Sequence, residues 1–326
     1  MTNVSLVEAV NMALRRAMIE DESVIVLGED VGKNGGVFRA TDGLQKEFGP
    51  KRVLDTPLAE TGIAGIAVGA AAQGLRPVAE IQFMGFIYPA LDQIVNHASR
   101  LRNRTRGRLS CPMVLRAPTG GGIHAPEHHS ESTESMFTQI PGLRVVVPSS
   151  PAEAYGLLLA AIRDPDPVVF LEPTRLYRAA KQDIEDDGVA WPLDKAFIIR
   201  EGDDLTFVTW GAVRKETLAA AEKLAGEGIE AEVINVATLS PLDTDTILAS
   251  VEKTGRCVVV HEAARTSGFG AEIAARLAED GLMSLEAPIV RVTGPDTIMP
   301  LPKSEHLYLP SVGQILEGAR KVLGIS

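Results

Sequence analysis

The segment from Asp55 to Gly74, DTPLAETGIAGIAVGAAAQG, places the carboxylate of Glu60 in a stretch of small and apolar residues. Thr56 and Pro57 suit the N-cap and the first position of a helix. Three glycines would leave one face of that helix free for close packing, and these are Gly62, Gly65 and Gly69. The pattern predicts a helix that is built to be buried.

Two interpretations of Glu60 follow from this pattern. Among Ile63, Ala64 and Ile66, a buried carboxyl would resist ionisation and share its proton near neutrality, as acid–base catalysis requires. A glutamate in the first turn of a helix is also favoured by the helix dipole, with no role in chemistry. The sequence pattern alone favours neither interpretation.

An aromatic pair, Phe83 and Phe86, follows the apolar run from Pro77 to Phe83. If that run is a parallel strand, both rings lie near the carboxyl edge of the sheet, where α/β proteins bind ligands. A flat ring of a ligand could stack there. Core packing is the more frequent reason for a lone phenylalanine, and it stays open here.

A glycine-rich loop, PTGGGIHAPEHHSESTESMF, contains three of the six histidines of the chain: His124, His128 and His129. A zinc site is one alternative, although no cysteine is nearby and Glu127 is the only obvious carboxylate ligand. A loop histidine that acts as acid or base is better supported chemically, because imidazole titrates near neutral pH. A histidine that is merely exposed is the third alternative.

Short runs rich in valine and isoleucine alternate with helix-compatible stretches and would position these residues. The predicted strands of the first set are 24–27, 52–55, 77–83, 113–116, 144–148 and 168–171. A helix with a capping box at Ser5 and Glu8 precedes them and opens the protein. The alternation predicts an α/β fold with a largely parallel sheet covered on both faces.

A polar, acidic stretch after Pro173 interrupts the alternation, and a second set of strands and helices follows. Its predicted strands are 205–210, 231–236, 257–260 and 289–292, and its predicted helices are 213–225, 244–251, 268–278 and 312–322. We therefore predict two domains, residues 1–190 and a smaller α/β domain of residues 191–326.

The formal charge of −11 opposes binding to nucleic acid or to anionic membranes. The one basic run, Arg100 to Arg108, alternates its arginines and suits a solvated loop or a frayed helix end better than one helical face. Two distant cysteines, Cys111 and Cys257, exclude a disulfide framework. With no signal-peptide pattern and no apolar run of about 18 residues, we expect a cytoplasmic protein.

Phosphate-binding signatures are missing: the sequence has neither a complete GxGxxG nor a GxxxxGK[ST] motif. Other motifs nevertheless occur in a characteristic order, namely LGEDVG, GGVFRATDGL, DTPLAETGIAG, EIQF, HHSES, DPDPVVFLEPTRLYR and VVVHEA. In order and spacing they resemble the β subunit of the decarboxylating component of 2-oxo acid dehydrogenase complexes, of the pyruvate and branched-chain kinds. The resemblance covers nearly the whole chain and implies a transketolase-like fold, with a pyrimidine-binding domain before a transketolase C-terminal-like domain.

The resemblance implies roles for four residues toward thiamine diphosphate. Glu60 matches the glutamate that hydrogen-bonds the aminopyrimidine ring, and Phe86 matches the aromatic residue that stacks on that ring. His129, rather than His128, matches the histidine near the substrate and the incoming lipoyl group. Glu29 matches an acidic residue in the channel between active sites, where it could relay protons.

The resemblance also implies a potassium site made largely of backbone carbonyls. The matching positions are Met113, Ala161, Ile162, Asp164 and Asp166. Asp166 departs from the commoner asparagine, although both residues offer an oxygen. An ordinary turn in DPDP explains the same residues equally well.

The diphosphate and its magnesium ion need a GDG motif with a downstream asparagine, and this chain contains no GDG. The resemblance therefore implies that a separate α subunit holds both, so that the cofactor lies across a subunit interface. Further expected partners are a second β subunit, in a heterotetramer, and a lipoyl-bearing dihydrolipoyl acyltransferase. Pyruvate is the expected 2-oxo acid. Branched-chain 2-oxo acid or acetoin dehydrogenase, a self-sufficient transketolase-like enzyme and a non-catalytic assembly subunit are the alternatives.

Overall fold

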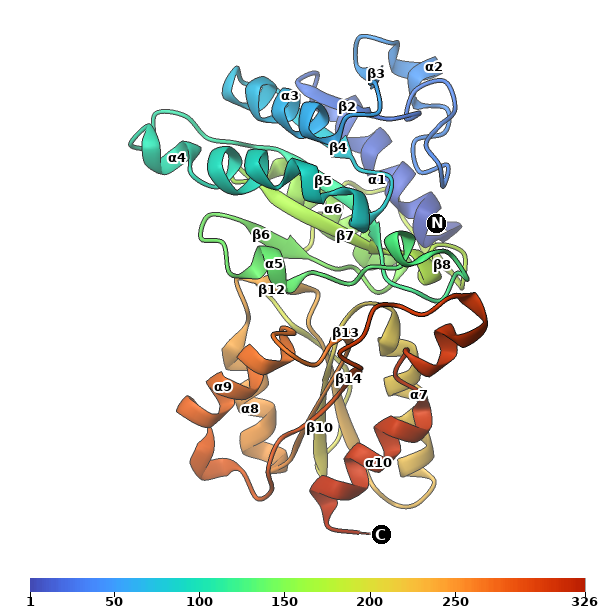
Figure 1. Cartoon of the computed structure of the whole chain (residues 1–326), viewed down its shortest axis with the longest axis vertical. Helices are drawn as coiled ribbons and strands as arrows, with labels where there is room; N and C mark the ends of the chain where they lie inside the picture. The colour runs from blue at the N-terminus through green and yellow to red at the C-terminus, as the bar shows by residue number, and fades with distance from the viewer. Residues whose placement is uncertain (326) are drawn as a thin grey trace.

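Two large sheets, each covered by helices, dominate the computed structural model, which describes residues 1–325. One sheet has seven strands and the other has five. Figure 1 shows the N-terminal part of the chain above the C-terminal part, with the two sheets facing each other end to end. This arrangement confirms the predicted α/β fold.

The larger sheet is parallel except at one edge. In spatial order its strands are β3 (Val53–Asp55), β2 (Val24–Gly28), β4 (Arg76–Glu80), β5 (Val114–Thr119), β7 (Val168–Pro173), β6 (Arg144–Val146) and β12 (Thr238–Ser240). The six predicted runs correspond to the six parallel strands. β12 is antiparallel and comes from the C-terminal part of the chain.

Helices cover both faces of this sheet, because successive strand residues point to opposite sides. Val78 of β4 packs in the core under α1 (Leu6–Glu20) and α6 (Pro151–Arg163), whereas its neighbour Ala79 packs in the core under α3 (Glu60–Ala72). The predicted capping box starts α1, since both the N–H and the hydroxyl of Ser5 donate to Glu8.

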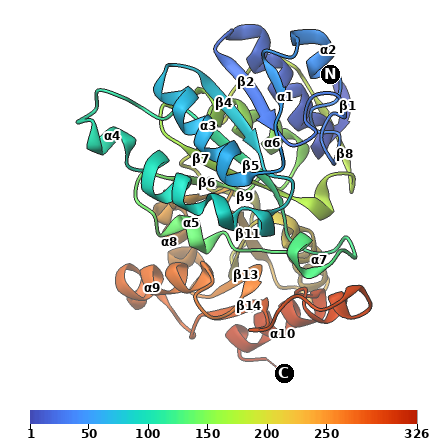
Figure 2. The same ribbon diagram turned by 45° about the horizontal axis from the view of Figure 1, so that its top comes forward.

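The smaller sheet has the order β14 (Val290–Gly294), β13 (Cys257–Ala264), β10 (Leu205–Thr209), β11 (Ala231–Asn235) and β9 (Phe197–Arg200), and only β9 is antiparallel. Helices α7 (Arg214–Ala225) and α10 (Val312–Leu323) cover one face. Helices α8 (Thr244–Thr254) and α9 (Gly270–Asp280) cover the other, as Figures 1 and 2 show from two sides.

Chain segments cross between the two parts. β12 lies beyond the predicted boundary yet extends the larger sheet, and Trp191 packs against Gly156 of α6. One continuous apolar core also includes Leu27 of β2 and Val208 of β10. The division into residues 1–190 and 191–326 stays a prediction about folding units.

Several local expectations were wrong. The chain opens with a strand, β1 (Thr2–Ser5), which pairs with β8 (Lys181–Ile184) in the stretch that we expected to be an irregular linker. Helix α3 begins at Glu60 instead of after Thr56, because the N–H of Thr56 bonds to Gly28 of β2 and keeps the chain extended there. β4 ends at Glu80, three residues before Phe83.

The basic run forms the short helix α4 (Leu101–Arg104) and the turn after it, and its five arginines are exposed. Among residues 1–325, no helix is both long and apolar enough to cross a membrane.

A buried ion cluster joins the middle strands of the larger sheet. The guanidinium of Arg116 forms a two-pronged ion pair with Glu172, at 2.7 and 2.6 Å, and a further pair with Glu80. Tyr177 also donates to Glu172, at 2.6 Å. All four side chains are buried. Burial raises the pKa of Glu80, the charge of Glu172 adds to the rise, and Arg116 opposes it.

We expect Arg116→Met to destabilise the chain by about 3–5 kcal/mol, because the change strands buried carboxylates without their cation. Denaturant titration followed by circular dichroism measures the loss. The control is Arg15→Met, which removes an exposed ion pair with Glu47 and should change stability by about 1 kcal/mol or less. Equal stability of the two variants would show that the buried cluster contributes no more to the free energy of unfolding than the exposed ion pair does.

Candidate active site

The candidate site lies where the carboxyl ends of β2 and β4 meet the start of α3. The N–H of Ile81 makes the last bond from β4 to β5, to the carbonyl of Arg116, before the chain leaves the sheet. Phe83 is extended, and a single 3₁₀ turn, Met84–Phe86, follows it. Both aromatic rings are thereby held beyond the carboxyl edge of the sheet.

The structure brings the predicted aromatic residues and one histidine together. The ring centroid of His129 lies 4.4 Å from that of Phe83 and 5.2 Å from that of Phe86, both edge-on. His128 lies farther from Phe86, at 6.5 Å. Nδ1 of His129 is buried and has no hydrogen-bond partner among residues 1–325. The imidazole is therefore held by packing against the two aromatic rings and not by a hydrogen bond from this nitrogen.

The other two histidines of the loop face separate carboxylates. Nδ1 of His124 lies 3.1 Å from Glu305, and Nδ1 of His128 lies 4.0 Å from Glu131. In the part of the chain that the structure describes, no cluster of three or more His, Cys, Asp or Glu side chains has the geometry of a metal site. The loop therefore offers one packed histidine and two exposed ones.

Glu60 and Glu29 approach each other from α3 and from the end of β2. Burial raises the pKa of Glu29, and the negative charges of Asp30 and Glu60 add to the rise. The two carboxylates therefore interact electrostatically across the site. A proton shared in this region would stabilise the pair.

Glu60 itself is half-buried and lies in the first turn of α3. Ile63 and Ala64 are buried beneath it, as predicted, but Ile66 is 55% exposed. The small-residue face is also open, since Gly62 and Gly69 are exposed. Within this chain the prediction of a buried helix was wrong, because α3 has only one face against the sheet. The open face leaves room for a second polypeptide.

Four of the positions matched to a potassium site lie at the end of α6 and in the turn after it, and the fifth, Met113, directly precedes β5. The carbonyl of Met113 accepts from the N–H of Val168, at 3.0 Å. Nη1 of Arg76 donates to the carbonyls of Ile162 and Asp164, at 2.9 and 3.3 Å. Each carbonyl oxygen keeps a second lone pair, and the end of a helix favours a cation. The donor chemistry therefore fits potassium, in competition with Arg76.

The side chain of Asp166 is engaged elsewhere in this region. Its Oδ1 accepts from Nε of Arg102, at 2.6 Å. Ala161 lies in the last turn of α6. Neither residue distinguishes the cation site from an ordinary turn.

Comparison with known proteins assigns this architecture to a family. The model of the transketolase pyrimidine-binding domain matches residues 2–180, and that of the transketolase C-terminal domain matches residues 194–315. The pyruvate dehydrogenase E1 component subunit beta of Bacillus subtilis (strain 168) is 50% identical over 323 residues, which cover 99% of each chain. The protein of the same name from Acholeplasma laidlawii is 51% identical over 322 residues, which cover 99% of this chain and 98% of the relative.

The chain belongs to the family of E1 β subunits. Its fold is that of a transketolase: the solved structure described as "Split gene transketolase, inactive beta4 tetramer" superposes with a TM-score of 0.82. That likeness covers 99% of both chains at 23% sequence identity, and it shows the fold alone. The family assignment agrees with the resemblance carried by the sequence motifs.

Three polar residues beside the site were not predicted from the sequence. The hydroxyl of Tyr88 donates to Glu131 of the histidine loop, at 2.7 Å, and burial together with that carboxylate raises the pKa of Tyr88. Glu262 and Glu305, from the C-terminal part, accept hydrogen bonds from the same loop. Glu262 stands in the motif VVVHEA, but its contact spans 141 positions in the sequence, so no local pattern could have indicated it.

The 3₁₀ turn and the histidine loop touch through Gly85. A Cβ at this position would lie 2.3 Å from the carbonyl oxygen of His128. We expect Gly85→Ala to push the loop outward and to destabilise the chain by about 1–3 kcal/mol. Hydrogen exchange of loop amides and denaturant titration measure these effects.

Gly69→Ala is the matched control, because its Cβ would meet no heavy atom within 4 Å. In a helix this change should be neutral or stabilising by up to about 1 kcal/mol. Unchanged loop exchange in Gly85→Ala would show that the contact does not position the loop.

Proposed function

We propose that this chain is the β subunit of a pyruvate dehydrogenase E1 component, which decarboxylates pyruvate with thiamine diphosphate and transfers the acetyl group to a lipoyl group. The observation that carries the proposal is the packing of His129 on Phe83 and Phe86, on the same sheet edge as the Glu29 and Glu60 carboxylates. The names of the E1 β relatives support the same reaction.

Thiamine diphosphate, when bound, supplies the electron sink that allows a 2-oxo acid to lose carbon dioxide. Two features of this chain fit the pyrimidine half of that cofactor: the half-buried ring of Phe86, which offers a stacking surface, and the carboxyl of Glu60 at the open start of α3. Phe86 would orient an aromatic ring. Glu60 would hold a proton against a ring nitrogen, and a partner chain would exclude water from it.

His129 and Glu29 would donate and accept protons at the two ends of the site. The imidazole of His129 packs between aromatic rings with Nδ1 buried, so Nε2 is the nitrogen that would face the substrate and the lipoyl group. Glu29, whose pKa is raised by burial and by the charges of Asp30 and Glu60, would pass a proton toward Glu60. Both roles extend what the family resemblance implies.

The proposed assembly with an α subunit is based on a motif that this chain lacks. Without a GDG motif, the magnesium ion and the diphosphate would be held by an α subunit, which would cover the exposed small-residue face of α3. We infer an assembly of two α and two β chains in the cytoplasm that docks on a lipoyl-bearing dihydrolipoyl acyltransferase. Branched-chain 2-oxo acid and acetoin dehydrogenases are the alternatives within the same chemistry.

Reconstitution with an α subunit tests the proposal. We expect Glu60→Gln to lower 2-oxo acid turnover by about 10²–10⁴-fold, because the amide holds no acidic proton. Turnover with thiamine diphosphate and magnesium is measured for pyruvate, a branched-chain 2-oxo acid and acetoin. The chain by itself should be inactive.

Glu47→Gln is the control for this measurement, because Glu47 is an exposed residue in an ion pair with Arg15. Full turnover by Glu60→Gln would favour a non-catalytic assembly subunit. Activity of the chain without its partner would favour a self-sufficient transketolase-like enzyme and would refute the shared site.

Potassium binding at Met113, Ala161, Ile162, Asp164 and Asp166 is part of the proposal and has its own test. A cation that binds only the folded chain at one hundred times its Kd stabilises it by about 2.7 kcal/mol. We therefore expect a higher melting temperature in potassium chloride than in choline chloride of the same ionic strength. Identical melting temperatures would mean that Arg76 satisfies these carbonyls without a cation.

A further inference from the structure

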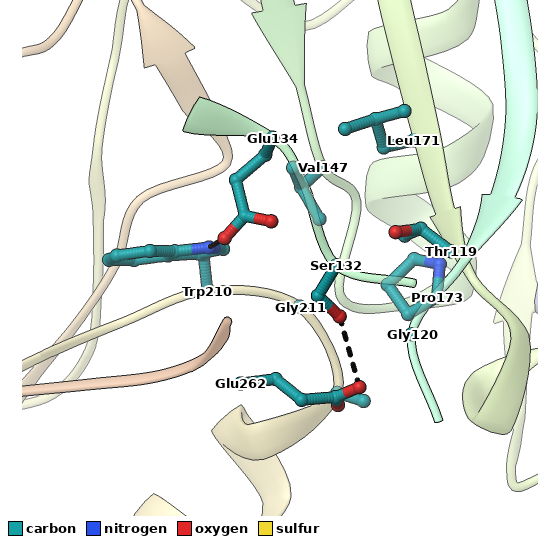
Figure 3. A pocket seen from close by; sticks show the side chains of 11 residues that line it. Thr119, Gly120, Ser132, Glu134, Val147, Leu171, Pro173, Trp210, Gly211 and Glu262 are labelled. Carbon is teal, nitrogen blue, oxygen red and sulfur yellow. Dashed lines mark hydrogen bonds between the residues drawn. The ribbon is translucent and has the colours of Figure 1, made fainter. Parts of the chain in front are cut away.

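The histidine loop, residues 119–134, lies between the two parts of the chain and is bonded to both. Its two ends leave β5 and enter α5 (Ser135–Thr138) of the N-terminal part. Its polar contacts, however, are mostly with the C-terminal part, to which the proposed chemistry assigns no residue. Figure 3 shows this junction, where Glu134 reaches Trp210 and Glu262 faces the hydroxyl of Ser132.

Glu262, near the end of β13, accepts hydrogen bonds from both the N-terminal and the C-terminal side of the histidine loop. Its Oε1 accepts from the N–H of Gly121, at 2.5 Å, and from the hydroxyl of Ser132, at 3.1 Å. Glu262 is 8% exposed, and Arg175 is the nearest cation, at 4.0 Å. One carboxylate thereby links Gly121 to Ser132, which follows it by eleven positions.

Glu305 lies in a 3₁₀ segment, Pro302–Leu307, that precedes α10. It accepts hydrogen bonds from the N-terminal side of the histidine loop. Its two oxygens accept from the N–H of Gly122, at 2.6 Å, and from the N–H of His124, at 3.0 Å. Glu305 is 2% exposed. A carboxylate taken this far out of water needs such donors, and the backbone of the loop supplies them.

The three glycines of the loop lie against side chains that leave little room for a Cβ, and two of these side chains are the carboxylates. A Cβ at Gly120 would lie 2.8 Å from Oε1 of Glu262, and one at Gly121 would lie 3.1 Å from Oε1 of Glu305. A Cβ at Gly122 would lie 2.3 Å from Arg175. Gly120 and Gly122 also have positive φ angles, of 83° and 91°. The run of three glycines therefore allows two carboxylates to reach the backbone.

The far end of the loop has a third anchor. Nε1 of Trp210 donates to Glu134, at 3.0 Å, and both side chains are buried. Trp210 follows β10, so this bond also links the loop to the C-terminal part. Between the anchors lies His129, whose own Nδ1 has no partner among residues 1–325. The place of its imidazole therefore depends on its packing against Phe83 and Phe86 and on the backbone that carries it.

We propose that Glu262 and Glu305 are positioning residues, which hold the loop from the C-terminal part and thereby set the place of His129. This inference rests on the function proposed for His129. In this arrangement the C-terminal part contributes no reacting group. It contributes the rigidity that acyl transfer to a large, incoming lipoyl group requires.

The test combines hydrogen exchange of the full chain with two activities of the reconstituted complex. In Glu305→Ala we expect exchange of the amides of residues 121–131 to rise by at least about tenfold, because two charge-assisted bonds are lost. Acyl transfer to the lipoyl group should fall by at least about tenfold. Decarboxylation measured with an artificial electron acceptor should stay within about threefold, since Glu60 and Phe86 lie outside the loop.

Three further variants make the result decisive. Glu305→Gln keeps the shape and part of the hydrogen bonding, so it should fall between wild type and Glu305→Ala in both loop exchange and acyl transfer. Glu227→Ala, which breaks an exposed ion pair with Arg320 in the same part of the chain, should match wild type. His129→Ala should lose acyl transfer with normal loop exchange.

Unchanged loop exchange in both Glu305 variants would overturn the positioning role. If the Glu305 variants loosen the loop but His129→Ala still transfers acyl groups, the positioning role stands and the role proposed for His129 fails. The experiment therefore tests the positioning role of Glu305 separately from the role of His129.

Discussion

A glycine-rich loop can present a histidine at a defined place only if something outside the loop holds its backbone. Glycine has no side chain to pack and the largest conformational freedom, so the loop from Thr119 to Glu134 has little rigidity of its own. Here buried carboxylates accept its N–H groups, and His129 then packs on Phe83 and Phe86. Much of the geometry of the site depends on these bonds.

The two-part architecture follows from that constraint. The larger sheet places Glu29 and the aromatic pair at its carboxyl edge, and the smaller sheet delivers Glu262 and Trp210 to the same junction. A shared apolar core and the crossing strand β12 keep the two parts from separating. The C-terminal part thereby contacts the loop that carries His129.

The site is also unfinished in the single chain. Glu60 is half-buried, and the face of α3 beside it exposes Gly62, Gly69 and Ile66. The proton-sharing role proposed for Glu60 requires a drier setting than this. The same open face that leaves Glu60 wet offers a surface on which small side chains permit close approach of another helix. Completion of the site and assembly with a partner would then be one event.

Local information determined much of this protein from the sequence alone. Alternating apolar runs predicted the six parallel strands, because side chains in buried strands must be apolar on both faces. Motif order predicted the family and singled out Glu60, Phe86 and His129. Local patterns were less certain at element ends: Thr56 suits an N-cap, but a bond to Gly28 delays the helix to Glu60.

Only the tertiary structure decided which distant groups meet. Glu262 and Glu305 bond residues that precede them by at least 130 and more than 180 positions, respectively, and no periodicity encodes such a contact. β12 likewise joins the larger sheet from the other part of the chain. The degree of burial of Glu60 was also decided by packing, because a helix pattern tells which face is apolar but not whether a neighbour covers it.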